Sequence, residues 1–196
     1  MIQTLVKNWW LLALCGSLQL AISTIYVIME RTGGPVLSQS WTGTVELAGK
    51  LAIAAGLCTI AAALWRSRNG RSWGLALNGV ALAALGFIQY RLTRFQISIG
   101  TVAALIIVMA VSMGLVELKI ARDFRRRSHV GDGWFFGLAG IVSVSLVLPS
   151  VALGLRWVAL QPGSHLDLLW LASYFGVAAV SIMALAARLH RQGYWT

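Results

Sequence analysis

The feature that most constrains the fold is a long uncharged run near the start of the chain. Residues 8–29 contain no Asp, Glu, Lys or Arg over 22 positions. An α-helix rises about 1.5 Å per residue, so about 20 apolar residues cross the roughly 30 Å of hydrocarbon in a bilayer. Strands are disfavoured, because lipid requires backbone hydrogen bonds to close within the segment. The run predicts a transmembrane helix, retained rather than cleaved as a signal peptide because no A-x-A site follows it.

Five further apolar segments have a similar length. They cover residues 44–65, 72–90, 95–116, 134–155 and 166–187. Charged residues make up only 11% of the 196 residues, whereas a soluble domain usually carries about 25%. So few charges cannot cover a globular surface in water, whereas a lipid bilayer requires none. We predict an all-α, multi-pass membrane protein whose six transmembrane helices form one domain over residues 1–196, with the lipid bilayer as its partner.

The basic residues indicate the orientation of these helices. Eleven of the 16 Lys and Arg residues lie at the termini or in loops on the same side, and five lie on the other side. Cytoplasmic loops carry the excess of Lys and Arg. We therefore predict a protein of the bacterial plasma (inner) membrane with both termini in the cytoplasm. The run Arg125, Arg126 and Arg127 is either this topology signal or a binding site for anionic lipid. The basic residues fall between apolar runs, which argues against nucleic acid as a partner.

A spacing of six residues between Trp and Gly recurs three times. It joins Trp10 to Gly16, Trp73 to Gly79, and Trp134 to Gly140. Each Trp begins an apolar run, where its ring suits the membrane interface, and each Gly lies deeper, where it lets another helix approach closely. The other three segments carry small-residue pairs instead: Ala52 and Gly56, Ala110 and Gly114, Ala172 and Gly176. We interpret the chain as three helical-hairpin repeats, of about residues 8–66, 72–120 and 133–190.

Pro149 leaves the fifth segment open to two interpretations. A helix that stopped there would run only from residue 134, which is short for a bilayer. We expect the helix to continue through Pro149 with a kink. The alternative is a break at Pro149, with residues 150–160 lying in the outer interface.

The residues that catalyse reactions or bind metals in proteins do not form a recognisable pattern here. No arrangement of Ser, His and Asp, of Cys and His, or of paired carboxylates is apparent. His165 and Asp167 could supply two metal ligands, but two ligands do not make a closed site. Cys15 and Cys58 both lie near the cytoplasmic side of their helices and should stay reduced. We expect a non-enzymatic protein without cofactor-binding or metal sites.

Polar residues within or beside the apolar segments are the stronger functional lead. Glu46, Lys50, Arg156 and Asp167 fall in the outer third of the predicted bundle or at its edge. They are either separate interfacial residues that reach water, or a polar cluster in which the two carboxylates pair with Lys50 and Arg156. Glu117 follows the fourth segment directly, and its position is typical of an interfacial residue.

The segments that carry the Trp and Gly pairs also resemble a known family. NWWLLALCGSLQLAIS, SWGLALNGVALAALGF and GWFFGLAGIVSVSLVL are similar to the odd-numbered helices of the HdeD-like acid-resistance membrane proteins. WLASYFGVAAVSIMALAARLHR resembles the closing helix of that family. The resemblance implies a six-helix inner-membrane protein with a role in acid or envelope stress. We expect such a role, exerted through assembly and including a homo-oligomer; the alternative is a small transporter or channel.

Overall fold

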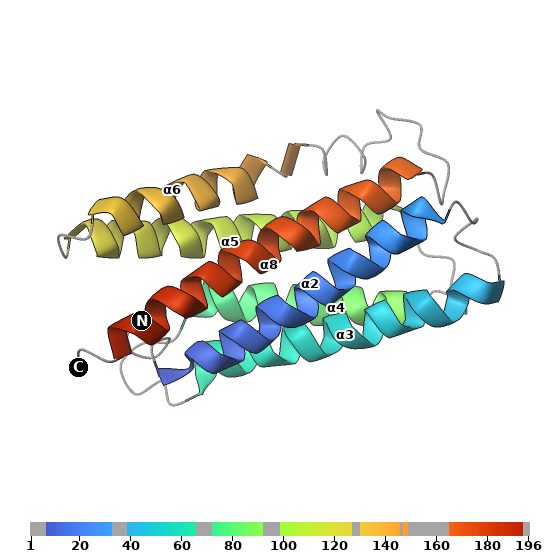
Figure 1. The fold of residues 1–196 in the computed structure, drawn as a ribbon, viewed down its shortest axis with the longest axis horizontal. Helices are drawn as coiled ribbons and strands as arrows, with labels where there is room; N and C mark the ends of the chain where they lie inside the picture. The colour runs from blue at the N-terminus through green and yellow to red at the C-terminus, as the bar shows by residue number, and fades with distance from the viewer. Residues whose placement is uncertain are drawn as a thin grey trace.

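The computed structural model describes residues 7–32, 39–65, 72–91, 99–126, 130–145, 147–148 and 165–193. These residues form six α-helices: α2 (Trp9–Arg31), α3 (Gln39–Leu64), α4 (Trp73–Arg91), α5 (Ile99–Arg126), α6 (Val130–Ser145) and α8 (His165–Gly193). Figure 1 shows them side by side along the long axis, with successive helices running in opposite directions. The predicted all-α architecture is therefore confirmed for the described part of the chain.

Five of the six helices are long and apolar enough to cross a membrane. The exception is α6, whose 16 residues fall short of the about 20 that a bilayer requires. Its predicted bounds were residues 134–155; it begins earlier, at Val130, and is described as far as Ser145, and residues 147–148 are also helical. Pro149, the predicted kink and the alternative interfacial segment 150–160 lie outside the described residues.

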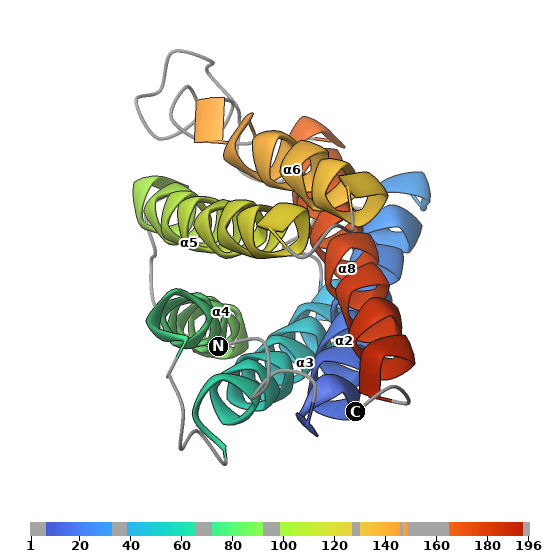
Figure 2. The ribbon, with the colours of Figure 1, turned by 90° about the vertical axis from the view of Figure 1, so that its left-hand side faces the viewer.

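The helices are arranged as a closed ring. Each packs against the helices before and after it in the sequence, and α8 closes the ring by packing against both α6 and α2 (Figure 2). The start of α2 and the end of α8 meet at the same end of the bundle, where the ring centroids of Trp9 and His190 lie 4.1 Å apart. The end of α3 lies there too, because Asn8 Nδ2 donates a hydrogen bond of 2.7 Å to the carbonyl oxygen of Trp65.

Helix α5 extends well beyond its predicted apolar segment. The prediction ended it at residue 116, before the first charge, but it continues to Arg126. The apolar positions explain the extension, since Met113, Val116 and Ile120 are all buried and are spaced three or four residues apart. The buried stripe thus passes the charged residues without interruption, and the helix extends from the end of the predicted apolar segment at residue 116 to Arg126.

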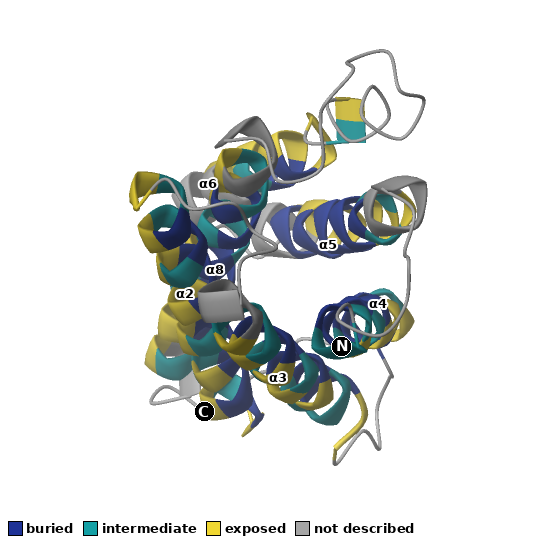
Figure 3. Ribbon diagram, turned by 90° about the vertical axis from the view of Figure 1, so that its right-hand side faces the viewer, coloured by how far each residue is buried: buried dark blue, intermediate teal, exposed yellow. Residues whose placement is uncertain are grey.

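The outside of this bundle is more apolar than the surface of a soluble protein. Large apolar side chains such as Leu57, Phe87 and Ile141 are exposed on the outside, whereas the polar Gln19 and Asn78 are buried. Figure 3 shows buried residues on the inward faces of the helices and exposed residues on their outward faces. An apolar exterior of this extent is unfavourable in water but matches a lipid environment. The fold is compatible with an integral membrane protein.

Candidate functional site

The closest helix packing occurs where glycines of α3 and α4 face each other. A β-carbon placed on Gly79 would lie 2.8 Å from the carbonyl oxygen of Gly56, and one placed on Gly86 would lie 2.6 Å from that of Gly49. Both distances are shorter than real β-carbons show. The two helices therefore approach so closely that only glycine fits at these positions, as in small-residue contacts between membrane helices.

Equivalent contacts join two other helix pairs. A β-carbon on Gly140 of α6 would lie 3.1 Å from the carbonyl oxygen of Gly114 on α5. A β-carbon on Gly16 of α2 would lie 3.2 Å from that of Ala179 on α8. Seven residues along α2, Ser23 Oγ donates a hydrogen bond of 2.7 Å to an α8 carbonyl, that of Ala172.

These contacts pair the helices differently from the predicted hairpins. The predicted repeats would pair α2 with α3, α4 with α5, and α6 with α8. The close contacts instead join α3 with α4, α5 with α6, and α2 with α8. Each Gly of the Trp–Gly spacing thus faces a small residue on the helix that precedes it around the ring.

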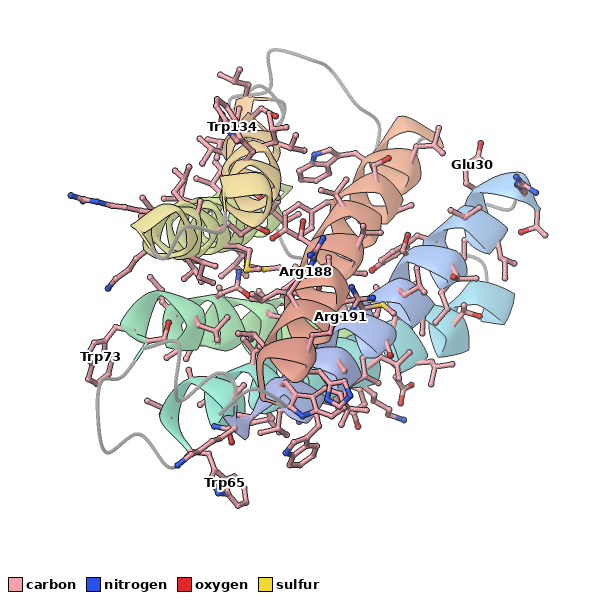
Figure 4. All side chains as sticks on the ribbon, turned by 60° about the vertical axis from the view of Figure 1, so that its left-hand side comes forward. Glu30, Trp65, Trp73, Trp134, Arg188 and Arg191 are labelled. Carbon is pink, nitrogen blue, oxygen red and sulfur yellow. The ribbon has the colours of Figure 1, made fainter. Side chains whose placement is uncertain are left out.

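The tryptophans of that spacing face away from the bundle. Trp10, Trp73 and Trp134 are all exposed, and so is Trp65 at the end of α3. Figure 4 shows the side chains of Trp65, Trp73 and Trp134 directed outward from the ribbon. They belong to the helix ends that also carry the basic residues Lys119 and Arg122 of α5. Exposed Trp beside basic residues is typical of a membrane interface.

Only part of the predicted outer-face cluster falls within the described side chains. Lys50 Nζ lies 2.8 Å from Glu46 Oε1, one turn away on the same helix, and both side chains are exposed. The Lys50 ammonium also lies 5.5 Å from the ring centroid of Tyr90 on α4. Arg156 lies outside the described residues, and Asp167 is described only as part of the backbone of α8. The meeting of the four residues stays a prediction.

The predicted lipid-binding arginines lie at the end of α5. Arg125 and Arg126 belong to the last turn of that helix, and only their backbone is described. Arg127 lies outside the described residues. Arg122 is exposed one turn earlier, and in Figure 4 Arg188 and Arg191 lie on α8, the helix that closes the ring. Binding of anionic lipid at Arg125, Arg126 and Arg127 stays a prediction.

Glu117 is the most unusual polar residue in the bundle. It is only 1% exposed, and it lies within the apolar part of α5, Ala104–Arg122. Ser143 Oγ of α6 donates a hydrogen bond of 2.7 Å to Glu117 Oε2. The other carboxyl oxygen, Oε1, is buried and lacks a partner that meets hydrogen-bond geometry in the described part of the protein. Glu117 is therefore enclosed by the helices rather than exposed at the end of α5, and its depth in a bilayer stays a prediction.

Helix α8 contributes two further polar groups near Glu117. Ser181 interacts with the Glu117 carboxyl, and Tyr174 lies close enough to interact with it electrostatically. Both side chains are buried. The carboxyl of α5 thus lies where α5, α6 and α8 converge, and we name Glu117, Ser143 and Ser181 the buried carboxyl site.

Two other buried polar groups make contacts across helices. Asn78 Nδ2 of α4 donates a hydrogen bond of 2.9 Å to the carbonyl oxygen of Met109 on α5. The Cys15 Sγ of α2 lies 3.0 Å from the Thr59 hydroxyl of α3. Cys15 is buried and Cys58 is half-buried, and neither forms a disulfide.

The sequence contained a signal for the buried carboxyl site that was missed. Ala110, Met113, Glu117 and Ala121 share one helical face, and all four are buried. Continuing the small and apolar stripe beyond residue 116 would have placed Glu117 inside. Within the described residues, no group of three or more His, Cys, Asp or Glu gathers to form a possible metal site. Comparison of the chain with protein-family models, with curated proteins and with solved structures gives no match.

Proposed function

We propose that the chain is an integral protein of a bacterial plasma membrane that crosses the bilayer six times, with both termini in the cytoplasm. The apolar exterior carries this proposal, because large apolar side chains are exposed all along the outside of helices that are long and apolar enough to cross a membrane. The excess of basic residues at the ends of α5 and α8 supports the cytoplasmic assignment. For α6, a sixth crossing requires a contribution from residues after Ser145.

We further propose that the protein acts through assembly in the membrane during acid or envelope stress, without catalysing a reaction. The resemblance of its Trp–Gly helices to HdeD-like proteins supports the stress role. The close glycine contacts support a tightly packed bundle, since α3 and α4 approach closely at Gly56 and Gly79 and again at Gly49 and Gly86.

A survival assay tests the stress role. Deletion of the gene should lower survival after acid challenge, and expression of the wild-type chain should restore it. Expression of Gly56→Leu, which blocks the closest helix contact, should restore it less than Gly43→Leu, because a β-carbon on Gly43 would meet nothing within 4 Å. Unchanged survival of the deletion strain would contradict the stress role and leave the topology intact.

One observation favours a small transporter or channel as a second candidate. A buried ionisable side chain within a membrane span is costly, and such residues often mark ion or substrate pathways. Glu117 fits that description. Flux across proteoliposomes after a pH step distinguishes the candidates: a transporter gives flux that Glu117→Gln abolishes, whereas an assembly protein gives no flux above empty vesicles.

A further inference from the structure

The Glu117 carboxyl lies within the apolar part of α5, where an ionised group is costly. The residue lies five positions before Arg122, the last residue of the apolar part of α5, or about 7–8 Å along the helix. Its side chain is 1% exposed. If the span lies in a bilayer, the carboxyl is within the hydrocarbon layer, in its half nearer the basic end of the bundle. This inference therefore rests on the membrane location proposed above.

The hydrogen bonds of the carboxyl are incomplete. Ser143 satisfies Oε2 over 2.7 Å, but Oε1 lacks a partner that meets hydrogen-bond geometry among the described residues. An ionised carboxylate can accept several hydrogen bonds, and leaving one oxygen buried without a donor is costly. A protonated carboxyl needs fewer hydrogen-bond donors around it than a carboxylate does. It also has an O–H group that can donate a hydrogen bond to a neighbouring hydroxyl. The Ser181 hydroxyl on α8, which interacts with the carboxyl, can be that acceptor.

Among the described side chains, the groups that interact with the Glu117 carboxyl are Ser143, Ser181 and Tyr174, and none of them is a cation. On α8, Tyr174 is the titratable group that interacts with the carboxyl. The described side chains of α6 include no charged residue, and on α4 the only one described is Arg91, at the opposite end of the bundle. On α5 itself, Lys119 and Arg122 are exposed. A proton is therefore the simplest species that can neutralise Glu117 where it lies.

A metal or alkali cation fits the site less well. Hard cations such as Ca²⁺ take about 6–8 oxygen ligands. The described oxygen donors here are one carboxyl and the hydroxyls of Ser143 and Ser181. We propose that Glu117, Ser143 and Ser181 form a proton-binding site at the junction of α5, α6 and α8.

The location of the site gives proton binding a structural consequence. Helices α5 and α6 meet at Gly114 and Gly140, and α8 packs closely on α2 at Gly16. Packing between α6 and α8 is sparse by comparison. The site thus lies at the most sparsely packed interface of the ring, between α6 and α8. Binding of one proton there determines whether Glu117 is neutral or charged between the two tightly packed helix pairs.

Carbodiimide labelling of the full-length protein in vesicles tests the proposal. Dicyclohexylcarbodiimide is apolar and reacts with protonated carboxyls, so it should modify Glu117, with a yield that rises as pH falls. A water-soluble carbodiimide should modify the exposed Glu46 and leave Glu117 unmodified. Mass spectrometry of the peptides gives the yield at each residue over a pH series.

Two serines of α6 provide matched variants. Ser143→Ala removes the donor to Glu117 and should move the pH midpoint of labelling. Ser145→Ala, two residues away, should leave it unchanged, because the Ser145 hydroxyl is exposed and bonds to its own helix at the carbonyl oxygen of Val142. Both variants keep Glu117, so the test does not depend on the folding of Glu117→Gln.

Three results would overturn the proposal. Glu117 could stay unlabelled by the apolar reagent at every pH, or its labelling could be independent of pH. Protection by sodium at constant pH would instead assign the site to an alkali cation. Labelling in vesicles does not depend on cell survival. A negative labelling result therefore does not contradict the stress role, and a negative survival result does not contradict the proton-binding site.

Discussion

The closest contact between α3 and α4 predicts how much one methyl group destabilises the bundle. In Gly56→Ala, the new β-carbon would lie 2.6 Å from both the Gly79 carbonyl oxygen and the Ala83 amide nitrogen. Both are backbone atoms, so no flexible side chain can move aside. To bring 2.6 Å to the 3.4 Å of ordinary contact, the helices must separate locally by about 0.8 Å, which forfeits a quarter to a half of each dispersion well.

The free energy follows from the number of atom pairs affected. If about 40 pairs of about 0.15 kcal/mol each span the interface and lose about a third of their energy, the loss is about 2 kcal/mol. Ala also favours a helix over Gly by up to about 1 kcal/mol, which offsets part of the loss. Reversible unfolding in mixed detergent micelles, followed by circular dichroism, measures the change in free energy.

Gly43→Ala is the matched control, because it lies on the same helix and its β-carbon would meet nothing within 4 Å. It receives the same gain in helix propensity without the clash. Gly56→Ala should therefore be less stable than Gly43→Ala by about 2 kcal/mol, or about 30-fold in the unfolding equilibrium. Equal stability of the two variants would refute the close approach of α3 and α4.

Three further predictions concern single side chains. Asn78→Ala loses its hydrogen bond to Met109 and should lower the free energy of unfolding by about 0.6 kcal/mol, the average for interhelical hydrogen bonds within one membrane protein; no change in the micelle assay would contradict a bridge between α4 and α5. Cys58 should react with maleimide faster than the buried Cys15, and equal rates would argue against this packing. Lys50→Gln should leave stability unchanged at neutral and acidic pH, because its bond to Glu46 is exposed and local; a loss at one pH only would indicate a larger cluster.

The sequence predicted the helices best where their ends coincide with changes in composition. For α4, the predicted residues 72–90 differ by one position at each end from Trp73–Arg91, because basic residues flank the apolar run on both sides. For α5 the change in composition did not coincide with the end of the helix, which continues past Glu117 to Arg126. In the sequence, a charged residue inside a helix cannot be distinguished from one that follows the end of a helix. Only the burial of Ile120 and Ala121 distinguishes the two cases.

The buried carboxyl site was less predictable because it depends on three helices. Glu117, Ser143 and Ser181 are separated by many residues, and no local spacing connects them. The order of the helices around the ring, with α8 beside both α2 and α6, decides which faces meet. The glycine of each Trp–Gly spacing was visible in the sequence, but its partner was not, since in α8 the facing residue is Ala179 rather than Gly176.

The compartment of the two termini tests the six-crossing account most directly. An even number of crossings places both termini on one side of the membrane, whereas five crossings, with α6 failing to span, would separate them. Reporters fused before Lys7 and after Gly193 should therefore both report the cytoplasm, and a reporter within residues 33–38, between α2 and α3, should report the outside. Termini found in opposite compartments would contradict the account.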